Sequence, residues 1–414
     1  MRILLINKFY HVRGGADRYF FETAGILTQH GHEVIPFSTV HLKNKSTPYA
    51  KYFSRIGATE DDLSSMSVLA KMRLFLNGIY SFEAARQLEW LIRDTRPDIA
   101  HVHNILYQLT PSIFPVLHRH NIPVVQSLHD WHIICGGAYL YTKGSRCERC
   151  KGGRFFHCAL HKCYRNSFGT SLMASLSKYA DNTLDLWKSG ADAFTVPAQH
   201  MVDRLSAWGF QKSRIHIIPN PFHLDGLKPT FQAGDYVVWY GRLLRLKGIY
   251  TVLQAAKELP HIRFEMYGSG PEEANAHAYI ANNGLKNVFL DTTTRWGPEL
   301  QNQITNALCV VEPSDWYQPS QYVIWEAFAL GKGILATNIG GTPDMVDEGI
   351  NGSMFEPGNA TQLARAITRL SENRNLAIDW GKAARSKVEK MTDTFYDRLM
   401  EIYQLAREVR RGRT

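Results

Sequence analysis

The sequence has no run of about 18 consecutive apolar residues, and this absence excludes a membrane-spanning helix. Its first ten residues, MRILLINKFY, lack the small-residue cleavage site of a secretory signal peptide, so we expect a cytoplasmic protein. The composition is neither that of a disordered chain nor that of a collagen or a coiled coil. With 414 residues, of which 44% are hydrophobic, the chain is long enough for two packed domains.

The net charge of +9 is carried almost wholly by the first half of the chain. Residues 1–192 contain 23 Lys and Arg against 15 Asp and Glu, whereas the remaining residues contain 24 against 23. An anionic partner of the first half would explain this asymmetry, and phospholipid, pyrophosphate and nucleic acid are the candidates. The alternative explanation is that the charge serves solubility alone.

Short apolar runs alternate with helical patterns along both halves. In the first half we expect strands at 2–7, 33–38, 98–102 and 124–128, with a helix over 17–29. In the second half we expect strands at 236–240, 263–267, 288–290, 309–312 and 334–337, with helices over 248–258, 272–283 and 322–330. This alternation predicts an α/β protein made of two Rossmann-like, doubly wound domains that face each other across a cleft.

Proline and glycine gather between residues 218 and 231, in the stretch IPNPFHLDGLKPTF, and this marks the domain boundary. We therefore expect an N-terminal domain over 1–218 and a C-terminal domain over 219–392. A cysteine-rich insert over 144–165 is assigned to the first domain. The segment 393–414 is expected to be a helix that returns to the N-terminal domain, although its basic end could instead be disordered.

Two stretches of the second half join a strand to a helix and suit a nucleotide. In the first, YGRLLRLKG, Arg242 and Lys247 offer two cations beside a helix N-terminus, as a pyrophosphate requires. In the second, residues 313–327, Glu326 stands among apolar neighbours, where a carboxylate needs hydrogen-bond donors such as sugar hydroxyls. The N–H groups near Gln321, Tyr322 and Val323 could hold a second anionic group. The alternatives are a solvated basic turn and a salt-bridged buried glutamate.

Several short motifs recur in a fixed order along the chain. They are GGADR (14–18), GHEV (31–34), DIAHVHN (98–104), SLHD (127–130), PNP (219–221), GR (241–242), KG (247–248), GSGP (268–271), PS (313–314), EA (326–327) and GGTP (340–343). Each is weak alone. In this order and spacing, the chain resembles the family-4 retaining glycosyltransferases of the GT-B architecture over nearly its whole length.

The resemblance implies a nucleotide-sugar donor bound mainly by the C-terminal domain. Arg242 and Lys247 would clamp its diphosphate, and Glu326 would accept hydrogen bonds from the ribose. Its base would lie near Gly268 and the segment 292–295. The implied donor-binding set also includes Gly14, Gly15, Thr294, Arg295, Gln321, Tyr322 and Val323.

The resemblance also assigns His129 as the cleft histidine that contacts the donor sugar, where it could support a developing oxocarbenium charge. A histidine that merely fills the core is the alternative. The retaining outcome is implied by the family only. Because no Asp-x-Asp pair stands at a strand end, we expect no catalytic metal at the diphosphate.

One position departs from the family pattern, which has two glutamates eight residues apart. Gln318 stands where the first glutamate is expected, and Ser320 and Gln321 replace the usual Phe-Gly. Glutamine keeps a carbonyl acceptor but loses the negative charge, so a cationic transition state would be stabilised less. We expect retained nucleotide binding and reduced turnover. A natural variant for an unusual donor, a degenerate site and a laboratory substitution remain open.

Four of the six cysteines form a C-x2-C-x7-C-x4-C array at Cys147, Cys150, Cys158 and Cys163. Four soft ligands in 17 residues predict a structural Zn²⁺ site, with an iron–sulfur cluster as second choice. Free thiols or disulfides are the alternative, and a cytoplasmic location disfavours disulfides. Cys135 and Cys309 lie in apolar runs and are expected in the core.

Basic residues surround the array, so this flap could hold a lipid-linked pyrophosphate or touch the inner face of a membrane. An amphipathic segment at 67–88 could also lie against headgroups, although packing on the core is favoured. We therefore predict sugar transfer to a glycan or lipid-linked saccharide, with a catalytically silent nucleotide-sugar-binding protein as the alternative. A nucleic-acid binder is disfavoured, because few aromatic residues stand among the basic ones.

Overall fold

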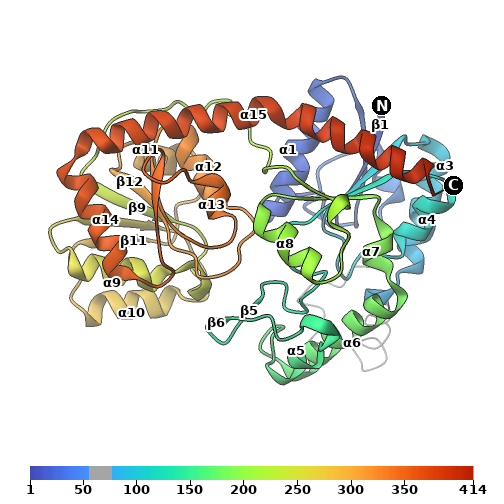
Figure 1. Ribbon diagram of the computed structural model, residues 1–414, viewed down its shortest axis with the longest axis horizontal. Coiled ribbons are helices and arrows are strands. Elements are labelled where there is room, and N and C mark those ends of the chain that lie inside the picture. Colours follow the sequence, from blue (N-terminus) through green and yellow to red (C-terminus); the bar gives the residue numbers. More distant parts are fainter. Residues whose placement is uncertain (56–76, 414) are drawn as a thin grey trace. The chain divides into compact units, whose positions relative to one another are not determined.

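The computed structural model describes residues 1–55 and 77–413, and the chain forms two compact units, each built on a parallel sheet (Figure 1). The first unit comprises Met1–Leu140, Glu148–Pro221 and Phe395–Thr414. The second comprises Tyr141–Cys147 and Phe222–Thr394. The doubly wound α/β fold predicted for both halves is thereby confirmed.

The first unit has a six-stranded sheet in the order β2-β1-β3-β4-β7-β8, with all neighbouring strands parallel. Its strands are β1 (Arg2–Ile6), β2 (Glu33–Phe37), β3 (Ile99–Val102), β4 (Val124–Ser127), β7 (Ala193–Val196) and β8 (Ile215–Ile217). Its helices are α1 (Gly15–Gln29), α3 (Phe82–Thr95), α4 (Ile113–Arg119), α5 (Phe156–Leu160), α6 (Phe168–Leu184), α7 (Leu186–Gly190) and α8 (Gln199–Ala207), with 3₁₀ turns η1 (Pro48–Tyr52), η2 (Lys151–Gly153) and η3 (Lys212–Arg214). Parallel strands need crossover connections, and these helices supply them.

The second unit repeats this construction in the order β11-β10-β9-β12-β13-β14. Its strands are β9 (Tyr236–Tyr240), β10 (Arg263–Tyr267), β11 (Val288–Asp291), β12 (Cys309–Glu312), β13 (Ile334–Thr337) and β14 (Gly352–Phe355). Its helices are η4 (Arg245–Lys247), α9 (Ile249–Glu258), α10 (Glu273–Asn282), α11 (Pro298–Thr305), α12 (Tyr322–Ala329), α13 (Thr342–Met345) and α14 (Ala360–Glu372). The strands expected at 236–240, 263–267, 309–312 and 334–337 have the predicted bounds.

Helices cover both faces of the second sheet, because alternate residues of its strands are apolar on both sides. Val237 and Trp239 of β9 pack with α9, α10 and α14. Val238 and Tyr240 point to the opposite face and pack with α11 and α12. A strand buried on both faces reads as a continuous apolar run, as YVVWY does.

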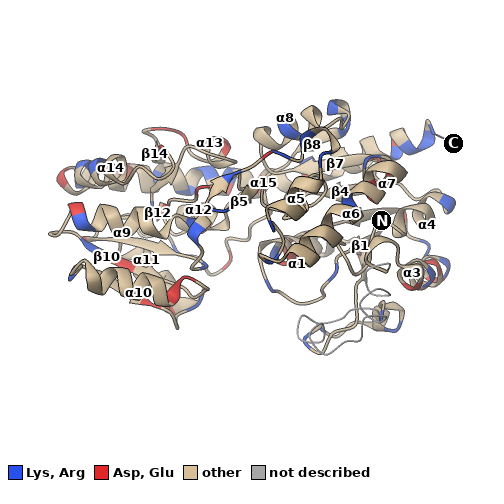
Figure 2. Cartoon of the chain, turned by 90° about the horizontal axis from the view of Figure 1, so that it is seen from below, with Lys and Arg blue, Asp and Glu red and all other residues tan. Residues whose placement is uncertain are grey.

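Helix α15 (Arg374–Arg411) starts in the second unit, and its last turns belong to the first unit. Its C-terminal end is rich in blue positions in Figure 2, and two arginines at this end of the chain bind one buried carboxylate. Arg410 donates two hydrogen bonds of 3.0 and 2.9 Å to Asp192, and Arg413 lies 3.3 Å from the same side chain. The basic end of the chain is therefore held against the first unit by ion pairs.

The insert expected over 144–165 is divided between the units. The hairpin β5 (Tyr141–Thr142) and β6 (Ser145–Arg146) belongs to the second unit, where Arg146 Nε lies 3.7 Å from Asp315 Oδ1. Residues from Glu148 onward belong to the first unit. Residues 144–147 of the expected insert thus fall in the second compact unit and residues 148–165 in the first.

None of the helices in the described part of the chain is long and apolar enough to cross a bilayer. Residues 67–76 of the expected amphipathic segment 67–88 lie outside the described residues. Its described end forms the start of α3, where Ala84 and Leu88 are buried and Phe82 is exposed.

Candidate functional site

The loops that follow β9, β10 and β11 lie side by side at the carboxyl edge of the second sheet. The Gly241 N–H donates to Tyr267 O at 2.9 Å, and the Gly268 N–H donates to Asp291 O at 2.9 Å. The Leu243 N–H bonds Ser269 O at 3.0 Å. The structure thus brings the loop that carries Arg242 against the one that carries Gly268, at the edge where doubly wound sheets bind ligands.

Two glycines of this edge cannot carry a side chain. Gly268 has φ +145°, and a Cβ added there would lie 1.8 Å from Gly241 O. Gly248 has φ +67°, and its Cβ would lie 1.8 Å from Pro313 O. The N-terminus of α9 can therefore approach the loop after β12 only with glycine at position 248.

Lys247 is fixed in place beside this approach. Its Nζ donates to Gln318 Oε1 at 2.7 Å and lies 3.6 Å from Glu312 Oε1, with 20% of the side chain exposed. Burial lowers the pKa of Lys247, and the Glu312 carboxylate partly opposes that change. The ammonium is thus partly desolvated and oriented, as a group that binds an anion should be.

Gln318 is bound into the same cluster. Its Oε1 accepts from Lys247 and from Ser314 Oγ at 3.2 Å, and its Nε2 donates to Ser320 O at 3.3 Å. The Gly341 N–H also donates to the Gln318 carbonyl at 2.9 Å. The side chain therefore acts first as an acceptor for the lysine.

The N-terminus of α12 adjoins this cluster through the loop after β13. Gln321 precedes the helix, is 1% exposed and donates through Nε2 to Thr342 Oγ1 at 3.2 Å. Tyr322 and Val323 form the first turn, and the Val323 carbonyl accepts from Tyr240 Oη at 3.1 Å. Glu326 is buried, as expected from its apolar neighbours.

The remaining predicted donor residues of this unit lie on more open loops. Arg242 is exposed. The Thr294 hydroxyl donates to the Asp291 carboxylate, and hydrogen bonds from Thr293 and Thr294 lower the pKa of Asp291. Arg295 Nη1 donates to Thr292 O at 2.8 Å and to Thr294 O at 3.1 Å, so its guanidinium is held by its own loop.

In the first unit, a buried carboxylate organises the glycine loop after β1. Asp17 accepts from Asn7 Nδ2 at 2.9 Å and from the Arg13 N–H at 3.1 Å. Gly14 has an extended backbone with φ −167°, and no atom lies within 4 Å of the Cβ that another residue would place there. The fold itself therefore does not require glycine at 14. Gly15 is the first residue of α1.

His129 follows β4 and belongs to a group of stacked imidazoles. His103 Nδ1 and His129 Nε2 are 3.1 Å apart, and the two rings are nearly parallel, with an angle of 4° between their planes. Burial lowers the pKa of His129 to about 4, while Asp130 partly opposes the change. His101, bound to Tyr403 Oη at 2.8 Å, has its pKa lowered to about 3 by burial. His129 is therefore neutral at pH 7 and can exchange hydrogen bonds without adding positive charge.

The predicted cysteine ligands do not form a closed group. Among the described residues there is no set of three or more His, Cys, Asp or Glu side chains arranged to hold a metal ion. Cys150 and Cys158 share one small core with Phe155, against which Cys163 packs, whereas Cys147 belongs to the second unit. Cys163 is hydrogen-bonded to Cys158, and that bond, together with burial, raises the pKa of the Cys158 thiol. Cys309 is buried in the core, as expected, but Cys135 is only half-buried and faces Cys163.

Two sequence profiles match the chain. The one described as "Glycosyltransferase Family 4" matches residues 13–225, about half of the chain, and the one described as "Glycosyl transferases group 1" matches residues 229–387. The chain belongs to glycosyltransferase family 4. The resemblance drawn from the motifs is thereby confirmed at the level of the family.

Three curated relatives are identical to this family-4 chain at fewer than a third of the aligned positions. It is 28% identical over 204 residues to the D-inositol 3-phosphate glycosyltransferase of Paenarthrobacter aurescens, covering 45% of this chain and 50% of that protein. It is 29% identical over 227 residues to the sulfoquinovosyl transferase SQD2 of Arabidopsis thaliana, covering 54% and 40%. The chain therefore matches about half the length of these relatives. It is 23% identical over 363 residues to an "uncharacterized 42.6 kDa protein in cps region" of Klebsiella pneumoniae, covering 83% and 87%.

Solved structures share the fold. Sucrose-phosphate synthase from Thermosynechococcus elongatus aligns with a TM-score of 0.68 and 19% identity, covering 99% of this chain and 98% of that one. Anabaena Alr3699/HepE, solved in complex with UDP and glucose, aligns with a TM-score of 0.60 and 16% identity, covering 97% and 99%. These likenesses establish the GT-B type of fold for the family-4 chain.

Sequence reasoning missed two residues of the candidate site. Glu312 touches Lys247, and its carboxylate also accepts from Ser314 Oγ while only 3% of the residue is exposed. A charged residue that ends an apolar strand, as in CVVE, was the available signal. His103 was quoted only as part of DIAHVHN, and the signal was a second histidine at the end of a neighbouring strand.

Proposed function

We propose that this chain transfers a sugar from a nucleoside diphosphate donor to a glycan or lipid-linked saccharide at the cytoplasmic face of a membrane, with the basic N-terminal domain in peripheral contact. The observation that carries the proposal is the Lys247 ammonium, oriented by Gln318 and Glu312 at the carboxyl edge of the second sheet. Membership of glycosyltransferase family 4 supports it. So do relatives whose names describe sugar transfer, and a structural neighbour solved with UDP and glucose.

Each site residue has a chemical role in this proposal. Lys247 and Arg242 neutralise the diphosphate, the N–H groups at the start of α12 bind its remaining oxygens, and Glu326 accepts from the ribose hydroxyls. The base lies near Gly268, Thr294 and Arg295. No catalytic metal is required in this scheme, because these cations and the helix N-terminus meet the charge of the leaving group.

Transfer proceeds with retention of configuration at the anomeric carbon. The bond from that carbon to the phosphate oxygen breaks, and its electron pair leaves with the diphosphate. The acceptor oxygen then bonds the carbon from the same face, and its proton passes to the leaving phosphate oxygen. Neutral His129 hydrogen-bonds the sugar without opposing the positive charge that develops on the ring.

The test is titration of the protein with UDP, and of each variant after its melting temperature has been measured. Lys247→Ala and Arg242→Ala should each weaken binding by at least tenfold, because each removes a charge-assisted hydrogen bond of about 1.5–3 kcal/mol. Lys257→Ala, a lysine of α9 bound to Asn283, is the matched control and should bind UDP normally. Equal affinities for the three variants and the unchanged protein would refute the proposal.

Gln318 favours a second candidate, a protein that binds nucleotide sugars but does not transfer them. Both candidates predict UDP binding, so they are separated by the initial rate of sugar transfer to a membrane-lipid extract that contains saccharide acceptors. A rate above background supports the enzyme. Gln318→Glu should raise that rate if the missing carboxylate limits turnover, and equal rates would remove this idea.

We also propose that the cysteine array binds structural Zn²⁺, with an iron–sulfur cluster as the second choice. Support comes from the soft ligands of Cys147, Cys150, Cys158 and Cys163, three of which meet around one small core. Metal analysis of the purified protein should find one Zn²⁺ per chain, lost in Cys158→Ser and kept in Cys309→Ser. Comparing Cys147→Ser with Cys135→Ser identifies the fourth ligand, because Cys135 faces the same thiols.

A further inference from the structure

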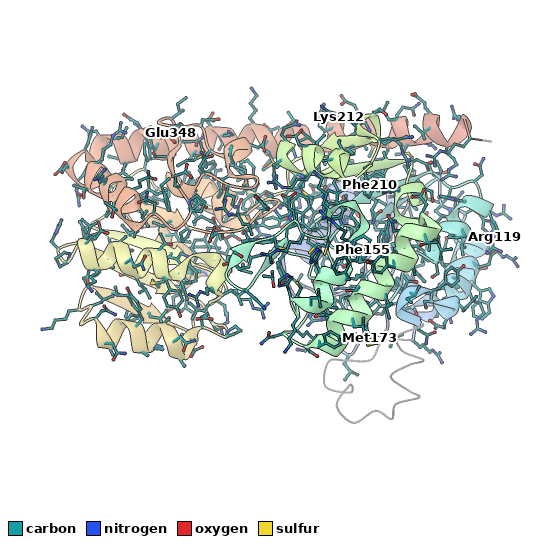
Figure 3. The ribbon with its side chains drawn as sticks, turned by 60° about the horizontal axis from the view of Figure 1, so that its bottom comes forward. Arg119, Phe155, Met173, Phe210, Lys212 and Glu348 are labelled. Carbon is teal, nitrogen blue, oxygen red and sulfur yellow. The ribbon has the colours of Figure 1, made fainter. Side chains whose placement is uncertain are left out.

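Helix α6 is amphipathic, but its apolar side faces outward and its polar side is buried. Five large apolar side chains over its first twelve residues, Phe168, Leu172, Met173, Leu176 and Tyr179, are 37–52% exposed. Its buried side chains are Ser171, Ala174, Ser175, Ser177, Lys178 and Asp181. Figure 3 labels Met173 at the outer edge of this helix and Phe155 inside the unit. A helix at a protein surface normally turns its apolar stripe inward, so the orientation of α6 requires an explanation.

The orientation of α6 is fixed by bonds on its inner side. Ser175 Oγ donates to Phe155 O at 2.8 Å, which ties the helix to the cysteine-containing segment. Lys178 is buried, pairs with Asp181 of the same helix at 2.7 Å, and places its Nζ 5.4 Å from the centre of the Trp187 ring in α7. Rotating the helix to bury its leucines would break the bond to Phe155 and the contact with Trp187.

Helix α5 extends the apolar surface. Phe156 and Leu160 are 47% and 62% exposed, and the Phe156 N–H donates to Tyr179 Oη of α6 at 3.3 Å. We call these seven side chains, five from α6 and two from α5, the α5–α6 apolar face. Contiguous apolar surface of this kind marks a binding surface for a partner or a membrane.

The segment that adjoins this face is strongly basic. Between Glu148 and α6 the exposed cations are Arg149, Lys151, Arg154, Lys162 and Arg165. The single acidic residue of this segment, Glu148, is engaged by Arg204 at 3.1 Å. The apolar face is therefore accompanied by a net positive charge.

We propose that the α5–α6 apolar face docks on an anionic phospholipid surface, with the basic segment against the headgroups. Apolar side chains enter the acyl boundary while lysine and arginine pair with lipid phosphates, and interfacial helices bind through the sum of both contributions. A second copy of this chain is a less favourable partner for this face, because a twofold contact would bring two basic segments together. This inference deepens the peripheral contact proposed above and does not depend on sugar transfer.

The experiment is co-sedimentation of the full chain with vesicles of phosphatidylcholine, with and without phosphatidylglycerol. The chain should bind the mixed vesicles and bind pure phosphatidylcholine at least tenfold more weakly. Leu172→Ser/Leu176→Ser should lose at least tenfold in binding to the mixed vesicles. Leu42→Ser/Ile350→Ser removes exposed apolar side chains elsewhere and should bind normally. Lys151→Gln/Lys162→Gln should weaken binding and reduce its dependence on salt.

Several results would overturn this inference. They are failure of the unchanged chain to bind mixed vesicles, normal binding by Leu172→Ser/Leu176→Ser, and a dimer that this variant dissociates, which would identify a second copy as the partner for this face. UDP titration of the same preparations keeps the two proposals apart. Normal UDP binding without vesicle binding overturns only the docking inference, whereas vesicle binding without UDP binding overturns only the donor site.

Discussion

The carboxyl edges of the two sheets have the same construction, but one carries charged groups and the other neutral ones. At the second edge a buried carboxylate, Glu312, and an ammonium, Lys247, lie 3.6 Å apart. At the first edge, burial keeps the imidazoles of His101, His103 and His129 neutral. The difference suits the proposed division of tasks, in which one edge holds a leaving diphosphate and the other meets a sugar that becomes positively charged. Four experiments test this contrast.

Gly248→Ala should cause the largest loss. Its Cβ would lie 1.8 Å from Pro313 O at φ +67°, so we expect a cost of about 3–4 kcal/mol from overpacking and backbone strain together. UDP affinity should fall with it, because the loop that carries Lys247 must shift. The control is Gly284→Ala, which has φ +59° but no atom within 4 Å of the new Cβ and should cost about 1 kcal/mol. Thermal melting and UDP titration measure both, and equal stabilities would show that the close approach is unimportant.

Glu312→Gln should cost about 2 kcal/mol and change the pH dependence of UDP binding. Burial lowers the pKa of Lys247 and Glu312 raises it, so loss of the carboxylate lowers that pKa further. Binding needs the ammonium, so as the pH rises the affinity of the variant for UDP should fall at a lower pH than that of the unchanged protein.

A double variant and a matched control sharpen this result. The other charged groups near Lys247 stay unchanged in every variant. They are Arg242 and Arg245 on the same loop, and Asp315, which pairs with Arg146. Glu312→Gln/Gln318→Glu returns a carboxylate to Lys247 and should restore the profile. Glu265→Gln, a buried glutamate bound to Tyr267, should leave the profile unaltered. The same pH dependence of UDP binding in all variants would argue against a role for Glu312.

Acid should destabilise the first unit through its histidines. The pKa of His129 is lowered from 6.5 to about 4 and that of His101 to about 3, so the unfolded chain binds more protons between these values and 6.5. Their stabilising effect is complete above pH 6.5 and declines as the pH falls, by up to about 1.4 kcal/mol per pH unit for each histidine. Melting temperatures at about pH 7.5 and pH 5 should show this decline. His129→Asn should reduce it, whereas the exposed His261→Asn should not.

Gly14→Ala should have the smallest effect on stability, within about 0.5 kcal/mol, because the backbone there is extended and the space is open. Its effect should instead fall on the donor, with a loss of about tenfold in UDP-sugar affinity if a phosphate approaches this backbone closely. Unchanged affinity in Gly14→Ala would remove the donor role assigned to this loop.

The elements that sequence predicted well are those whose apolar runs are continuous. CVVE and ILAT are such runs, and β12 and β13 have the predicted bounds. Strands β7 (AFTV), β8 (IHI) and β14 (GSMF) were missed. Strands β8 and β14 are short and mix polar with apolar residues, whereas AFTV is a mostly apolar run that the same reasoning could have found.

The residues of the candidate site likewise divide into those that the sequence indicated and those that it did not. Lys247 and Gly268 were found because they belong to local loop motifs. Glu312 and His103 owe their roles to partners 65 and 26 residues away, a proximity that only the packed sheet creates. The direction in which the apolar side of α6 faces depends on contacts with other segments, those of Ser175 with Phe155 and of Lys178 with Trp187, and the helix sequence alone does not show these contacts.

Helix α15 has a consequence for the order in which the protein matures on the ribosome. Tyr403 is buried in the first unit and bonds His101, which precedes it by 302 residues. The unit that is translated first therefore stays incomplete until the last helix emerges, after the intervening unit has been synthesised.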